Sequence, residues 1–165
     1  MSNIKHLFKL SQGPEVWNQW RRENPRVLPD LSGANLQSAN LRGSNLYRAN
    51  LRGATLTNAD FSRTNLIKAN LRGADLTEAS FFRANLSEAD LRKVDCFRTN
   101  LVESAFYKAD LRGANLSGAD LTRANLRDAK IAKTVFTALL DLSDEQIQDF
   151  QARGAILIGN TASTV

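Results

Sequence analysis

Few residues in this 165-residue sequence have the chemistry that catalysis needs. His6 is the single histidine and Cys96 the single cysteine, and they lie far apart in the chain. Nucleophilic catalysis needs a nucleophile, a base and an orienting group close together, and no spacing in the sequence assembles such a set. There is also no glycine-rich phosphate loop and no Cys/His spacing typical of a metal site. We therefore predict no catalytic residues, no cofactor and no metal.

Anion binding is a second kind of chemistry that the charged residues offer. Four arginines recur at intervals of twenty residues, namely Arg52, Arg72, Arg92 and Arg112. If residues twenty apart stack on one another, these guanidinium groups form an arginine ladder that can bind phosphates or an acidic protein surface. The alternative interpretation is a solvated face, in which salt and the neighbouring Asp90 and Asp110 screen the arginines. A second, partial column contains Arg63, Arg83 and Arg123, interrupted by Glu103.

An apolar cluster is the other feature expected on the surface. If residues twenty apart stack, Phe82 and Val102 lie on one face, while Phe97 and Tyr107 flank Val102 on the adjoining faces of the same coil. Four apolar side chains so close together favour a docking patch for a protein partner, and ordinary surface variation is the alternative.

Both surface features depend on a repeat with a period of five residues. From Leu31 to Phe136, every fifth residue is one of sixteen Leu, four Phe, one Ile and one Cys, without a slip in register. The residue two before this centre is mostly alanine, and the residue one before it is Asn or Asp in seventeen of 22 pentads. Neither a helix nor a strand keeps a fixed face at this period, so each pentad is expected to form one side of a turning chain. The central residue of each pentad and the alanine two residues before it then point inward, and the other three residues face water.

The bends of this solenoid are assigned to Asn, Asp and Gly. Asn and Asp side chains bond nearby backbone and tolerate unusual φ and ψ angles, and glycine adopts such angles at no steric cost. Stacked turns pair their backbones at about 4.8 Å, so five coils make a rod about 25 Å long. Buried cysteines are usually inert, and Cys96 is expected in the core because it occupies a pentad centre.

Repeats such as Ala49-Asn50-Leu51-Arg52-Gly53 resemble the pentapeptide-repeat family, whose pattern is A(D/N)LXX. The resemblance covers about residues 29 to 138 and implies an all-β solenoid, a right-handed quadrilateral β-helix with four pentads per coil. The segment VWNQWRRENPRVLPDLSGANL also looks like the N-terminal cap of cyanobacterial members. The stretch from Val94 to Tyr107 departs most from the pattern, and a local bulge is expected there.

The ends of an open solenoid need covering, since they expose a layer of core and an unpaired backbone edge. In the N-terminal segment, Ile4, Leu7 and Phe8 share one helical face, and a second helix should run from 14 to 23. These apolar groups, together with Val16, Trp17 and Trp20, are expected to pack over the first coil.

At the C-terminal end, the sequence from Ser143 to Gln146 predicts a capping box, with Gly154 ending the helix. Residues 155–159 could pair as a short strand, either within the chain or across a dimer. The expected domains are an N-terminal α-helical cap at 1–28, the β-helix at 29–138 and a C-terminal helical cap and tail at 139–165.

Composition favours a cytoplasmic protein without a membrane anchor, because no apolar run approaches about 18 residues and the N-terminus lacks a signal peptide. We expect a non-enzymatic protein-interaction scaffold, with anion or nucleic-acid binding through the arginine ladder as the alternative. The best-known members of the resembled family mimic DNA and inhibit type II topoisomerase, a role that needs an acidic surface. The net charge here is +5, which argues against it. The sequence leaves the oligomeric state open.

Overall fold

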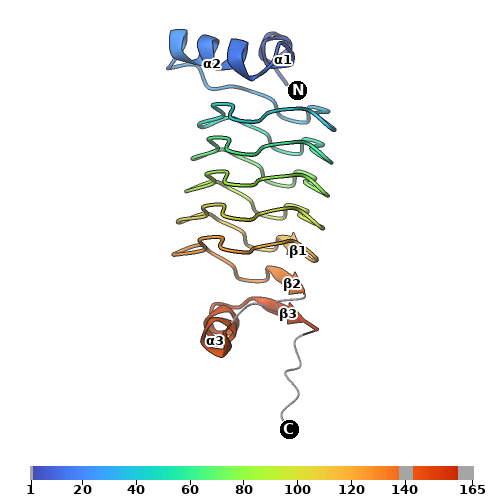
Figure 1. Cartoon of the computed structure of the whole chain (residues 1–165), viewed down its shortest axis with the longest axis vertical. Coiled ribbons are helices and arrows are strands. Elements are labelled where there is room, and N and C mark those ends of the chain that lie inside the picture. The colour runs from blue at the N-terminus through green and yellow to red at the C-terminus, as the bar shows by residue number, and fades with distance from the viewer. Residues whose placement is uncertain (1, 138–142, 160–165) are drawn as a thin grey trace.

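The repeat winds as a right-handed β-helix whose coils contain twenty residues each. In the computed structural model, which describes residues 2–137 and 143–159, parallel β-bridges join residues twenty apart, from Asp30 and Asn50 to Asp110 and Lys130. One coil therefore contains four pentads, as the family resemblance implied. Figure 1 shows the coils stacked along the long axis, with helices lying across both ends.

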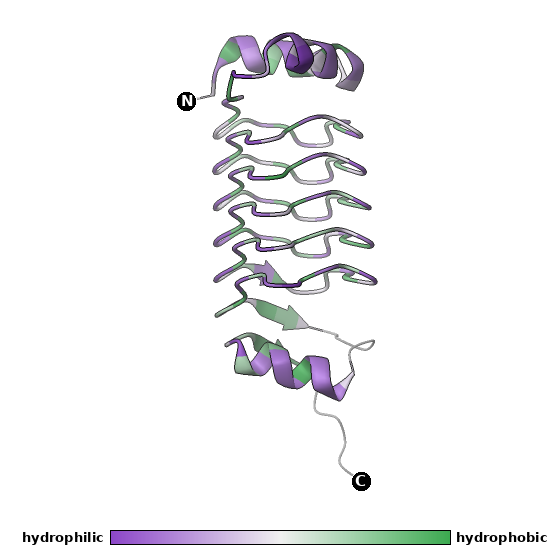
Figure 2. Cartoon of the chain, turned by 90° about the vertical axis from the view of Figure 1, so that its left-hand side faces the viewer, coloured by the Kyte–Doolittle hydropathy of each residue, from purple (hydrophilic) through white to green (hydrophobic). Residues whose placement is uncertain are grey.

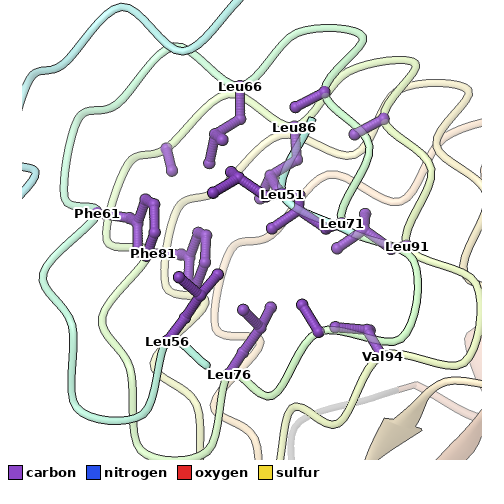
Figure 3. Close-up of a cluster of buried hydrophobic side chains, with 14 of the residues drawn as sticks. Leu51, Leu56, Phe61, Leu66, Leu71, Leu76, Phe81, Leu86, Leu91 and Val94 are labelled. Carbon is purple, nitrogen blue, oxygen red and sulfur yellow. The ribbon is translucent and has the colours of Figure 1, made fainter. Parts of the chain in front are cut away.

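The interior is filled by the two residues that each pentad was expected to bury. Leucines such as Leu51 and Leu71, twenty apart, stack in one column, and both are fully buried. Phe61 and Phe81 stack in another column with ring centroids 4.7 Å apart and nearly parallel planes. Figure 3 shows the leucine and phenylalanine side chains of these columns pointing into the interior of the coils. Close packing of this kind makes each centre sensitive to truncation.

The Asn or Asp that precedes the pentad centre stabilises the turn through its side chain. In all seventeen pentads that have one, its Oδ1 atom accepts a hydrogen bond from the backbone N–H two residues later. Such Asx turns satisfy a donor that the coil leaves unpaired. The left-handed backbone, however, lies three residues further on, at positions such as Gly53 and Lys68. The expectation that the Asn or Asp before each centre adopts the unusual angles itself is therefore wrong, although Asn58 and Asp128 occupy the later, left-handed position.

Regular elements are few, because each side of a coil is too short for a long strand. Strands β1, β2 and β3 form a parallel sheet in that order. The elements are α1 (Ile4–Ser11), α2 (Pro14–Glu23), β1 (Asn115–Leu116), β2 (Val135–Thr137), α3 (Asp144–Ala152) and β3 (Ile156–Ile158). Hydrophobic and hydrophilic stretches alternate along every coil (Figure 2). Among the helices within the described ranges, none has both the length and the apolar character needed to cross a membrane.

Helices α1 and α2 lie over the first coil, and α2 has the predicted bounds. Trp17 is fully buried and donates its Nε1–H to the carbonyl of Asn45 at 2.9 Å. Leu10 is also buried. The expected packing of Ile4, Phe8 and Val16 is wrong: these side chains are 79%, 64% and 39% exposed. The helices turn Leu10 and Trp17 toward the coil instead, which leaves the Ile4 and Phe8 side of α1 in solvent.

The C-terminal segment packs on the last coil within the same chain. Strand β3 pairs with β2, so the apolar stretch at 155–159 forms an intrachain strand. Phe150 of α3 lies against Phe136, with ring centroids 5.1 Å apart, and the predicted capping box at Ser143 is present. The expected boundary between 138 and 139 lies outside the described residues.

The segment from Val94 to Tyr107 continues the helix in register. Asp95 bridges Asp75 on one side and Asn115 on the other, and Ala105 bridges Asn85 and Asn125. The expected bulge is therefore wrong, because Val94 and Ala105 are small enough to occupy the positions of the usual residues.

One buried hydroxyl gives a test of the inward positions. Ser44 is fully buried where most pentads have alanine, and its Oγ has no hydrogen-bond partner among the described residues. We expect Ser44→Ala to raise the free energy of unfolding by about 1 kcal/mol, because an unsatisfied buried hydroxyl is removed. Thr64 stands one coil further in the same column, and its Oγ1 donates to the Leu41 carbonyl at 2.9 Å. Thr64→Ala should therefore destabilise. Urea unfolding of both variants measures this, and a shift in the same direction for both would contradict it.

Candidate functional site

The four arginines of the ladder stack in one column, as predicted. The backbone N–H groups of Gly53 and Gly73 bond to the carbonyls of Arg72 and Arg92, and that of Lys93 bonds to the carbonyl of Arg112. Each arginine therefore stands one coil above the next. Their guanidinium groups occur at intervals set by the interstrand spacing of about 4.8 Å.

The C-terminal half of the ladder is neutralised within the chain. Arg92 donates from Nε and Nη2 to the two oxygens of Asp90, at 2.8 and 2.6 Å. Arg112 bonds to Asp110 in the same way, at 2.9 and 2.7 Å, and Asp110 also lies 3.8 Å from Arg92. These side-chain hydrogen bonds hold the pKa values of Asp90 and Asp110 below their ordinary range. The two aspartates thus pair with these arginines, in line with the screening interpretation.

The N-terminal half of the ladder differs, because asparagines replace the aspartates. Arg52 follows Asn50 and Arg72 follows Asn70, and each amide oxygen accepts the arginine's backbone N–H. Neither guanidinium makes an ion pair with a described residue. The ladder is thus divided into a paired half and a half that keeps its positive charge.

A shallow depression lies beside the C-terminal half of the ladder. Its charged lining comes from three columns of residues twenty apart, the ladder column and the Asn/Asp and left-handed columns before it, namely Arg92, then Asp90, Asp110 and Lys130, then Glu88, Lys108 and Asp128. The cations and carboxylates alternate here, so the depression has little net charge. In the coils nearer the N-terminus, the same columns contain Arg48, Asn50, Lys68 and Asn70.

The second arginine column is partly neutralised by the residue that interrupts it. Glu103 accepts a hydrogen bond from Arg83 at 2.6 Å and lies 3.9 Å from Arg123. Arg83 is the main cause of the lowered pKa of the Glu103 carboxyl. Glu103 therefore neutralises part of this column, whereas Arg63 makes no ion pair with a described residue.

The structure brings together only part of the apolar cluster. Phe82 and Val102 stand in one column on successive coils, since Arg83 bonds through its N–H to the Val102 carbonyl and Arg63 to that of Phe82. Phe97 and Tyr107 are separated by half a coil, so they lie on opposite sides of the rod. One flat partner cannot contact both of them.

Cations cover the aromatic rings of this cluster. The guanidinium carbons of Arg83 and Arg98 lie 4.8 and 5.0 Å from the ring centroids of Phe82 and Phe97, and Nζ of Lys108 lies 5.0 Å from that of Tyr107. In each case the cation is the next residue in the chain, at the left-handed position. The sequence analysis missed these pairs. Each is an aromatic residue followed directly by a basic one, at the same place in its pentad, and this pattern is visible in the sequence.

The two residues with catalytic chemistry have structural roles. His6 accepts the backbone N–H of Asp30 on Nδ1 at 3.0 Å and packs against Trp20, with ring centroids 5.3 Å apart. Cys96 is buried in the core as predicted, and burial raises the pKa of its thiol far above the ordinary value. Among residues 2–137 and 143–159, no three His, Cys, Asp or Glu side chains lie close enough together to bind a metal ion.

The two aspartate pairs give a pH prediction. Because folding lowers the pKa of Asp90 and Asp110, their stabilisation is complete above the unfolded-state pKa of about 4 and disappears as the pH falls through the folded-state values. We expect the stability gap between the natural protein and the Asp90→Asn, Asp110→Asn double variant to stay constant from neutral pH to about pH 5 and to narrow below about pH 4. Denaturant unfolding at a series of pH values measures the gap. A gap that widens on acidification would contradict the assignment.

Comparisons with known proteins identify the same repeat. A family model described as pentapeptide repeats matches residues 30–66, 59–95 and 99–137, with eight copies. A solved pentapeptide repeat protein, Rfr23 from the cyanobacterium Cyanothece 51142, is 26% identical with a TM-score of 0.63, covering 72% of this chain and 92% of that one. A search of curated proteins gave no match.

A second solved relative is HetL from the cyanobacterium Nostoc sp. strain PCC 7120, a pentapeptide repeat protein involved in heterocyst differentiation regulation. It is 34% identical with a TM-score of 0.46, covering 64% of this chain and 54% of that chain. The chain thus spans about half the length of HetL.

Proposed function

Because the chain belongs to the pentapeptide repeat family, we propose that it is a non-enzymatic protein-interaction scaffold that presents flat β-helix faces to a protein partner. The observation that supports this most is the order of its outward side chains. Backbone bonds fix every coil onto the next, so outward residues twenty apart form straight columns on a backbone that is rigid before binding. A preorganised surface loses little conformational entropy when a partner docks.

The column of Phe82 and Val102 is the apolar anchor of this scaffold. Both side chains are half-buried against their own coil, so only part of each apolar surface is in contact with water before a partner binds. Arg83 beside Phe82 adds a polar margin. Apolar side chains surrounded by polar groups are typical of protein interfaces. Phe97 and Tyr107 belong to the other sides of the rod and would contact separate parts of a partner that wraps around it.

The same proposal includes the organisation of the chain. Residues 1–28 form an N-terminal helical cap, 29–138 a β-helix of about five coils, and 139–165 a C-terminal helical cap and tail. The hydrogen bond from Trp17 to Asn45 and the packing of Phe150 on Phe136 support a capping role for both helical ends. We place the protein in the cytoplasm.

Comparative capture tests the scaffold. Tagged natural protein and the Phe82→Ser, Val102→Ser double variant are used to capture proteins from a lysate of the source cell, after nuclease treatment. We expect a defined protein that the natural chain captures and the double variant loses. Ile67→Ser is the matched control, because Ile67 is an apolar outward residue on another side of the rod. Retention of every captured protein by the double variant would overturn the role of this column.

Anion or nucleic-acid binding through Arg52, Arg72, Arg92 and Arg112 is the second candidate function. The absence of ion pairs at Arg52 and Arg72 within the described part of the chain favours it. Binding of this kind should weaken steeply with added salt, because phosphate contacts release counterions. A titration with DNA and RNA at increasing salt tests it, and affinity that does not change with salt would exclude it.

A further inference from the structure

Positive charge is concentrated in the N-terminal half of the repeat. Residues 31–74 contain six basic residues and one acidic residue, whereas residues 75–133 contain ten and nine. The repeated backbone is the same in both halves, so the difference lies entirely in the outward side chains. An acidic partner would therefore be attracted to the N-terminal half.

Within this half, three arginines stand in the columns that line the shallow depression further along the rod. Arg52 and Arg72 stand in the ladder, and Arg48 occupies the column of Lys68 and Glu88, two coils before Glu88. None of the three pairs with a carboxylate among the described residues, while Lys68 lies 3.5 Å from Glu88. Asp90 lies one coil below Asn70, but Arg92 already binds both of its oxygens.

The C-terminal half of the ladder shows which chemical group suits these arginines. There, a carboxylate accepts from both Nε and Nη2 of one arginine, and Asp110 also approaches the arginine of the coil above. Asn70 occupies the equivalent place between Arg52 and Arg72 and has no charge to offer. The group missing from the N-terminal half is therefore a carboxylate.

We propose that Arg48, Arg52 and Arg72 bind the carboxylates of an acidic segment of a partner protein. This inference rests on the proposed scaffold function and specifies the chemistry of its partner. The bidentate geometry seen at Arg92 and Arg112 provides the binding mode, and the coil spacing of about 4.8 Å sets the interval between the carboxylates. Glycines follow Arg52 and Arg72 in the sequence, so no aromatic side chain stands between these two guanidinium groups for stacking of nucleobases.

The test uses a fluorescent octaglutamate peptide as the probe and fluorescence anisotropy as the measurement, at low and at physiological salt. We expect the natural protein to bind it and Asn70→Asp to weaken binding about two- to fivefold, because the new carboxylate pairs with Arg72 and Arg52. Arg72→Gln should weaken binding by a similar factor. Arg112→Gln, which removes an arginine already paired with Asp110, should change it little. Asp110→Asn, which releases Arg112, should strengthen binding.

Asn100→Asp is the control for the change in net charge. It makes the same substitution on the opposite side of the rod, two residues before Val102. An equal loss of binding in Asn100→Asp and Asn70→Asp would overturn the site. Absence of octaglutamate binding by the natural protein would overturn it as well. Tighter binding of an octathymidylate, lost in Asn70→Asp, would identify a phosphate-binding site and overturn the acidic peptide as its ligand.

The scaffold and this site can fail separately. If the lysate experiment yields no protein partner while Asn70→Asp still weakens octaglutamate binding, the scaffold function fails and the carboxylate chemistry stands. If a captured partner is lost from the Phe82→Ser, Val102→Ser variant but is bound equally by Asn70→Asp, the scaffold stands and the arginine site fails.

Discussion

Replacing Leu71 with alanine should lower the free energy of unfolding by about 2 to 5 kcal/mol. Leu71 is fully buried at a pentad centre and stacks between Leu51 and Leu91, so truncation opens a cavity between two coils. The short sides of each coil are fixed by backbone bonds above and below, which limits how far the structure can collapse into that cavity. Urea unfolding followed by circular dichroism measures the loss.

Arg72→Ala is the matched control for Leu71→Ala, because Arg72 is the next residue and points outward. Its side chain makes no ion pair with the described residues, so its removal should change stability by less than about 0.5 kcal/mol. The reverse order of the two losses would show that the inward and outward positions of the pentad have been exchanged.

Much of the fold could be predicted from the sequence because the repeat constrains it at every level. The inward positions follow from periodicity alone, and even Cys96, an unusual centre, is buried where the register places it. The backbone angles could not be read in the same way. Asn and Asp were an obvious choice for the left-handed position, yet residues such as Arg63 and Lys68 occupy it because the hydrogen bonds of two neighbouring coils fix the backbone there.

The ends and the surface were less predictable for a different reason. Ile4 and Phe8 fit the face of an amphipathic helix, but the orientation of α1 is set by Leu10 and by contacts with α2, which no local pattern encodes. On the surface, the register placed Arg52, Arg72, Arg92 and Arg112 in one column. The neighbouring Asp90 and Asp110 were recognised as screening groups, but the contrast with Asn50 and Asn70, which leaves Arg52 and Arg72 without such a partner, was missed.

Replacing Trp17 with alanine should lower the free energy of unfolding by about 3 to 5 kcal/mol. Its ring is fully buried between α2 and the first coil, in contact with Trp20 at a centroid distance of 5.0 Å. Its Nε1–H is also the donor to the Asn45 carbonyl, which would lose that partner. Thermal or urea unfolding gives the total loss, and Val16→Ala, on the exposed side of the same helix, should cost far less.

Amide hydrogen exchange shows which coils lose protection in Trp17→Ala. In a solenoid each coil contacts only its neighbours, so loss of the covering helix should first expose the amides of the first coil. The N–H groups of Leu31 and Leu46, which bond to Asn50 and Asn65 of the next coil, should exchange faster, whereas that of Leu91 should keep its protection. Trp17→Phe separates the two contributions, because it retains most of the apolar contact and loses only the hydrogen bond, at a cost of about 1 kcal/mol. Equal acceleration along the whole rod would mean that α2 is not a local cap but part of a single cooperative unit with every coil.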